Sequence, residues 1–110
     1  MAAIANLSID QGATFTSDVT VKDANGNAFD LTGYTARAKL AKGYQSPQTR
    51  QDFTTTISNA TSGVVTLSLT ATQTTALDDT RYVYDLEIVN GDVVTRVIEG
   101  LISVRPQVTT

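Results

Sequence analysis

The sequence contains no cysteine and no histidine. The absence of cysteine excludes disulfides and thiol nucleophiles, and the absence of histidine excludes imidazole acid–base chemistry. Zinc sites built on these two side chains are excluded as well. A nucleophile–base pair could be assembled only from lysine or carboxylates. We therefore expect no enzymatic activity, no cofactor and no metal site, and stability that comes from core packing and sheet hydrogen bonds.

Charge and long apolar runs are also scarce. The chain has 8 Lys and Arg residues against 11 Asp and Glu, a net charge of −3, and a pI near 4.6. Nucleic-acid binding usually needs a basic face and a high pI, so no nucleic-acid partner is expected. No apolar run reaches about 18 residues, which predicts no membrane helix. The start of the chain, Met1 to Ile4, lacks the basic and apolar regions of a secretory signal.

What the chain does have is enough hydrophobic sequence for one domain. Its 110 residues are 41% hydrophobic and 17% charged. Chains of this length bury roughly two thirds of their unfolded surface, which suits one continuous core. We therefore predict a single domain over residues 1–110.

The dominant hydrophobic period is two, which is the period of half-buried strands. Turn formers such as Gly, Asn and Asp separate the alternating runs. About seven to eight short strands at this spacing are typical of an all-β sandwich or barrel. The runs cover residues 7–9, 13–22, 34–40, 53–57, 64–69, 82–89 and 93–104.

One segment interrupts the alternation. Thr70 and Gln73 have capping-box spacing, which predicts a short helical turn near residues 71–76. Nearby, Asp78 and Asp79 form a carboxylate pair whose expected role is in a turn or cap, because adjacent turn residues point in different directions.

Asp23, Asn25 and Asn27 share the spacing of the first ligands of a calcium loop. An EF-hand needs Gly at the sixth position and Glu at the twelfth, where this chain has Ala28 and Tyr34. We interpret the segment as a loop rich in turn formers.

Asn90-Gly91 is the strongest hairpin motif, because both residue types tolerate positive φ. A two-residue loop at this motif would place Val89 opposite Asp92. The same register would place Asp85 opposite Arg96 on the outer face, as an exposed ion pair that helps to set the register.

In that register the outer face of the last hairpin is unusually apolar. Val83, Val89, Val94 and Ile98 would point outward. Two interpretations stay open: scattered surface aliphatics or a phase shift at a bulge near Gly100, and a contact patch for a neighbouring subunit.

Asp78-x-Thr80-x-Tyr82 has the spacing of a tyrosine corner at the start of strand F in immunoglobulin-like sandwiches. In that motif the tyrosine hydroxyl bonds to backbone a few residues upstream. The motif predicts a structural role for Tyr82 and an immunoglobulin-like form of the sandwich.

Four phrases occur in order along the chain: FDLTGY at 29–34, GVVTLSLT at 63–70, RYVYDL at 81–86 and EGLISV at 99–104. This order resembles small immunoglobulin-like virion proteins of tailed bacteriophages, including the N-terminal domain of baseplate upper proteins. The likeness runs from about residue 15 to residue 108. It implies an antiparallel immunoglobulin-like sandwich that serves as a structural module of the virion, assembled in the host cytoplasm.

The resemblance also suggests how such a module acts. In baseplate proteins the domain attaches receptor-binding parts to the tail, whereas this sequence ends soon after the domain. We therefore expect an accessory tail or baseplate subunit that contacts other virion proteins, as a homo-oligomer or a multi-copy array. The alternatives are a capsid decoration protein and a host-surface recognition module, which would use Tyr44 in the loop 42–51.

Overall fold

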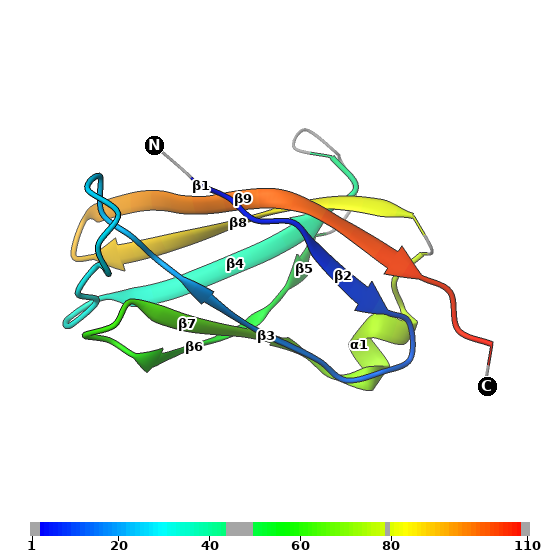
Figure 1. Cartoon of the computed structure of the whole chain (residues 1–110). Coiled ribbons are helices and arrows are strands. Elements are labelled where there is room, and N and C mark those ends of the chain that lie inside the picture. Colours follow the sequence, from blue (N-terminus) through cyan, green and yellow to red (C-terminus); the bar gives the residue numbers. More distant parts are fainter. Residues whose placement is uncertain (1–2, 44–49, 79, 109–110) are drawn as a thin grey trace.

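Two β-sheets pack face to face in the computed structural model, which describes residues 3–43, 50–78 and 80–108 (Figure 1). The first sheet has the order β1-β9-β8-β4-β5, and β2 also pairs with β9. Its strands are β1 (Ala3–Ile4), β2 (Leu7–Asp10), β4 (Thr35–Ala41), β5 (Gln51–Asp52), β8 (Arg81–Asn90) and β9 (Val93–Arg105). The second sheet has the order β3-β7-β6, from β3 (Phe15–Thr20), β6 (Thr54–Asn59) and β7 (Val64–Leu69).

The predicted all-β immunoglobulin-like sandwich is confirmed. One detail of the expectation is wrong, because the sheets are not purely antiparallel. Both N-terminal strands, β1 and β2, run parallel to β9, so the first sheet is mixed. The two-residue strands β1 and β5 also went unpredicted, since they are too short to show a period.

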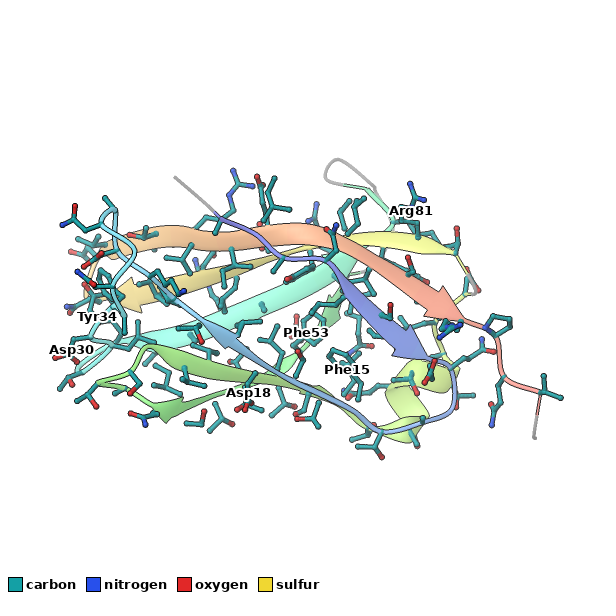
Figure 2. The ribbon with its side chains drawn as sticks, viewed as in Figure 1. Phe15, Asp18, Asp30, Tyr34, Phe53 and Arg81 are labelled. Atoms are coloured by element: carbon teal, nitrogen blue, oxygen red, sulfur yellow. The ribbon has the colours of Figure 1, made fainter. Side chains whose placement is uncertain are left out.

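The core lies between the sheets and is built from the alternating positions. Val65, Leu67 and Leu69 of β7 are buried, as are Leu86 and Ile88 of β8. Aromatic rings join the two layers. The Phe53 ring lies 6.0 Å from that of Phe15 and 6.1 Å from that of Tyr84, measured between centroids, and Figure 2 shows Phe15 and Phe53 close together between the sheets.

One side of the sandwich is closed by a chain segment that changes sheets. Gln51 and Asp52 pair with β4, and the segment then crosses so that β6 pairs with β7. At the crossing, Phe53 N donates a hydrogen bond to Ala38 O at 3.0 Å. Thr55 Oγ1 donates to Ala36 O at 2.8 Å. The Ala36 and Ala38 carbonyls on this edge of β4 are therefore occupied, which blocks pairing of the edge with other chains.

The opposite side depends on the N-terminal segment. Between β1 and β2 the Ala5 carbonyl accepts a hydrogen bond of 2.5 Å from the buried Tyr84 hydroxyl. Gly100 permits this approach, because a Cβ at that position would lie 2.1 Å from Ala5 O. Asn6 Oδ1 then accepts from Leu101 N at 3.0 Å. These contacts hold the N-terminal strands along β9.

Helix α1 (Ala71–Thr75) covers one end of the sandwich, and its predicted capping box between Thr70 and Gln73 is present. Thr74 is fully buried; its hydroxyl donates to Ala13 O at 2.9 Å and accepts from Gly12 N at 3.1 Å. These bonds attach α1 to the turn before β3. No helix in the described part of the chain has the length and apolar character needed to cross a membrane.

Replacing Tyr84 with Phe removes the donor to the Ala5 carbonyl without changing the packed ring. We expect the free energy of unfolding to fall by about 1–2 kcal/mol, since a partly buried carbonyl then lacks its partner. Urea unfolding of both proteins measures the difference. Tyr34→Phe is the matched control, and an equal loss in both variants would refute the role of the Ala5 bond.

Burial raises the pKa of the Tyr84 hydroxyl to about 12. Because the folded pKa exceeds the unfolded value of roughly 10, the contribution of this neutral phenol to stability is complete below pH 10. It is lost as the pH rises from about 10 to about 12. Unfolding curves across this window should show falling stability in the native protein and a shallower fall in Tyr84→Phe.

Candidate protein-contact surface

The outer face of the first sheet is the surface on which the sequence places its candidate contacts. Strand β8 lies between β4 and β9, so outward side chains from the three strands form neighbouring rows. The middle of this surface carries ionic groups, and its two ends carry aliphatic groups. The outward residues are Arg37 and Lys39 of β4, Val83, Asp85, Glu87 and Val89 of β8, and Val94, Arg96, Glu99 and Leu101 of β9.

The hairpin register differs from the predicted one. Asn90 remains in β8 and pairs with Val93, so the two loop residues are Gly91 and Asp92. Gly91 has a φ of 60°, and glycine with positive φ at the first central position is typical of a type II′ turn. Val89 therefore lies opposite Val94, and the predicted pairing of Val89 with Asp92 is wrong by two residues.

Ile98 is a second correction, because it faces the core and is 3% exposed. Arg96 pairs with Glu87, but the next pair joins Ile98 to Leu86, so Val97 is an extra residue in β9. This bulge reverses the inward–outward alternation of side chains in β9 at Val97. The sequence suggested such a phase shift near Gly100, three residues further along. After the bulge Leu101 points outward and is 39% exposed. The shift is hidden in the sequence because Val97 and Ile98 are both aliphatic.

As a result, the outward aliphatic residues form two separate pairs. Val83 lies opposite Leu101 at one end of the sheet, and Val89 lies opposite Val94 at the other. Val83 and Val89 are six residues apart on β8, which is about 20 Å in an extended strand. We refer to these as the Val83–Leu101 pair and the Val89–Val94 pair.

Ion pairs lie between the two aliphatic pairs on the outer face of the sheet. Arg37 Nε lies 2.7 Å from Glu87 Oε1. Arg96 Nη1 lies 3.5 Å from Glu99 Oε2 and 3.9 Å from Asp85 Oδ2. The predicted Asp85–Arg96 ion pair thus exists, although the two residues are diagonal neighbours. Burial, and then the nearby carboxylate of Glu87, raise the pKa of Asp85 above its usual value.

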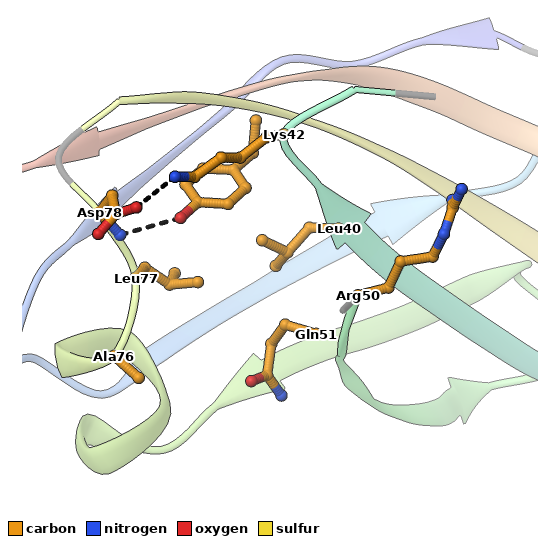
Figure 3. A pocket seen from close by; sticks show the side chains of 8 residues that line it. Leu40, Lys42, Arg50, Gln51, Ala76, Leu77 and Asp78 are labelled. Atoms are coloured by element: carbon orange, nitrogen blue, oxygen red, sulfur yellow. Dashed lines mark hydrogen bonds and ion pairs between the residues drawn. The ribbon is translucent and has the colours of Figure 1, made fainter. Parts of the chain in front are cut away.

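The tyrosine-corner residues lie at the start of β8, beside a hollow of about 350 Å³ (Figure 3). Asp78 N donates to Tyr82 Oη at 2.9 Å, the contact that a tyrosine corner predicts. Lys42 Nζ pairs with the Asp78 carboxylate, whose hydrogen bond raises the pKa of Lys42. Asp78 and Tyr82 therefore connect the end of β4 to the start of β8. The hollow is lined by Leu40, Lys42, Arg50, Gln51, Ala76, Leu77, Asp78 and Tyr82.

The remaining candidate residues have simpler positions. Asp23 Oδ1 accepts hydrogen bonds from Asn25 N at 2.9 Å and Asn27 N at 3.0 Å, so this carboxylate orders its own turn. Tyr44, the candidate recognition residue, and Asp79 both lie outside the described residues.

Comparisons with known proteins indicate the fold. No protein-family profile and no curated protein matches this sequence. Among solved structures, the chain is similar to the N-terminal domain of ORF48 of phage TP901-1, with a TM-score of 0.57 and 8% identity over 92% of this chain and 85% of that one. At such low identity this likeness shows the shared fold alone.

Two further likenesses are weaker. The chain is similar to InlP of Listeria monocytogenes, with a TM-score of 0.49 and 15% identity over 94% of this chain, but it spans only 28% of InlP. It is also similar to the filamin domain of Lin-41, with a TM-score of 0.41 and 16% identity over 89% of this chain and 82% of that domain. Neither carries an argument about function.

The reversed alternation in β9 can be tested by paired substitutions. Ile98→Asp places a carboxylate in the core and should cost more than about 3 kcal/mol of stability. Leu101→Asp places the same group at the surface and should change stability by less than about 1 kcal/mol. Thermal unfolding distinguishes the two, and the opposite ranking would refute the bulge at Val97.

Proposed function

We propose that the protein is a non-enzymatic structural protein of a tailed bacteriophage virion, an accessory tail or baseplate subunit that contacts other virion proteins. The observation that carries the proposal is the similarity of nearly the whole chain to the N-terminal domain of a phage protein. The order of the four sequence phrases supports the same assignment. The protein would be incorporated in several copies as virions assemble in the host cytoplasm.

The outer face of the first sheet supplies a contact surface suited to this role. Its central ion pairs are formed within the subunit, so a partner need not supply a countercharge for each group. The Val83–Leu101 and Val89–Val94 pairs supply apolar area at the ends. Fully burying one such side chain contributes about 1.5–3 kcal/mol, and these residues are already partly buried, so each contact is modest. Repetition on a symmetric particle would convert modest contacts into stable attachment.

The location of the protein on the particle can be tested with purified virions of the phage that encodes it. Heads and tails are separated, and each fraction is examined by quantitative mass spectrometry. We expect the chain in the tail fraction. Its presence in heads at fixed copy number would overturn the tail assignment in favour of capsid decoration. Its absence from both fractions would overturn the virion assignment.

The contact surface can be tested by complementing a phage that lacks the gene. Val83→Asp with Leu101→Asp, and separately Val89→Asp with Val94→Asp, place carboxylates on the two aliphatic pairs. At least one double variant should lower the copies per particle tenfold or more while remaining folded by circular dichroism. Thr54→Asp with Thr56→Asp, on exposed positions of β6 in the other sheet, is the matched control. Normal incorporation of both aliphatic variants would exclude this surface.

A further inference from the structure

Strand β3 is the end strand of the second sheet, and within the part of the chain that the structure describes only one of its edges is paired. It forms six consecutive antiparallel pairs with β7, from Phe15–Leu69 to Thr20–Val64. The N-terminal strand β2, which could have covered its other edge, pairs with β9 instead. Figure 1 shows β3 running along the front of the molecule with no strand of the second sheet beyond it.

The backbone groups on the open edge can be identified. Val21 N donates to Gly63 O at 2.7 Å, in the same register as the pairs of β3 with β7. Backbone groups alternate in direction along a strand, so those of Ser17 and Val19 also face β7. The N–H and C=O groups of Thr16, Asp18 and Thr20 therefore point away from the sheet, and the side chains of these three residues are exposed.

Apart from the single charge of Asp18, nothing in β3 itself protects this edge. Natural edge strands are usually blunted by proline, lysine, a bulge or short length. Strand β6, the other end of the same sheet, has a register shift between Ile57 and Asn59. The edge of β4 that faces away from β8 is covered by Phe53 and Thr55. By contrast, β3 is six residues long, regular, and free of proline and lysine.

We infer that the open edge of β3 pairs antiparallel with β3 of a second copy of the chain. In the register we assign, Ser17 lies opposite Ser17 of the second copy on the two-fold axis. Thr16 then lies opposite Asp18, and Phe15 lies opposite Val19. The two three-stranded sheets would join into one sheet that continues across both copies.

The side chains of β3 complement one another best in this register. Asp18 already accepts a hydrogen bond of 2.6 Å from Thr66, its cross-strand partner on β7, and a second threonine opposite would repeat that contact. Phe15 and Val19, which are both already buried in their own subunit, lie opposite each other without bringing a charge to the interface. A shift of one residue in each copy places Asp18 opposite Asp18, which is destabilising. The opposite shift places Phe15 opposite Ser17 and shortens the stretch over which the two strands overlap.

This interface is distinct from the contact surface proposed above. It uses the edge of the second sheet, whereas the proposed virion contacts use the outer face of the first. Failure of one would leave the other intact. An isologous pair of this kind is closed, because each copy has a single β3 edge.

A single engineered cysteine tests the register, because the native chain has none. In this register Ser17 and its counterpart form a non-hydrogen-bonded pair, with Cα atoms about 4.5 Å apart, which suits a disulfide. Ser17→Cys should give mainly cross-linked dimer under mild oxidation on non-reducing gels. Thr16→Cys is the control, since its counterpart lies diagonally at about 7–8 Å. Equal cross-linking of both, or of neither, would overturn the register.

A charge substitution tests the pairing without cysteine. Thr16→Asp places a carboxylate opposite Asp18 of the other copy, twice in each dimer, and should weaken self-association at least tenfold in sedimentation equilibrium. Thr20→Asp carries the same charge on the same strand but lies away from Asp18 of the second copy, so it should associate like the native protein. A native protein that stays monomeric at millimolar concentration would overturn the inference.

Discussion

The attachment of the N-terminal strand to β9 is the constraint on which most of this structure depends. A buried tyrosine must satisfy its hydroxyl, and Tyr84 does so on the Ala5 carbonyl. That carbonyl occupies the space that any side chain at Gly100 would need. The first sheet thereby gains parallel strands along its β9 edge. Because β2 pairs with β9, it does not cover the edge of β3 that faces away from β7.

The two sides of the sandwich differ in how their exposed strand edges are covered. On the β4 side, a strand that changes sheets places Phe53 N and Thr55 Oγ1 on carbonyls that would otherwise be exposed. On the other side, β2 covers β9 and leaves β3 uncovered. For the proposed multi-copy assembly one selective edge is an advantage, whereas several open edges would favour disordered aggregation.

In the proposed function, the outer face of the first sheet acts as a repeated weak contact. Its ion pairs are mutual and exposed, so they contribute little to folding. At the proposed interface their main effect is to restrict which partners fit, because an uncompensated like charge placed opposite them is unfavourable. The aliphatic pairs lie at the two ends of this charged region, about 20 Å apart along the strand direction. A partner must therefore match a pattern of apolar and charged positions, which favours specificity over strength.

Much of the architecture could be predicted from local sequence. Alternation with period two identified the long strands and the core residues of β7 and β8, because one face of each strand is buried. The capping box at Thr70 and the Asp78–Tyr82 contact were also predictable, since both involve residues only a few positions apart. The absence of cysteine and histidine limits the available chemistry whatever the fold, because no packing can supply a thiol or an imidazole.

Only the tertiary structure could decide the rest, because it depends on contacts between distant segments. The bulge at Val97 turns Ile98 inward and Leu101 outward, and two adjacent aliphatic residues cannot reveal such a shift. The turn at Gly91 moves the hairpin register by two residues through a difference in backbone geometry alone. The partner of the N-terminal strand was likewise undetermined, since β2 could pair with β3 or β9 on its sequence. Hydrophobic alternation determines which side chains of a strand share a face, whereas packing determines which face is inside and which edge remains open.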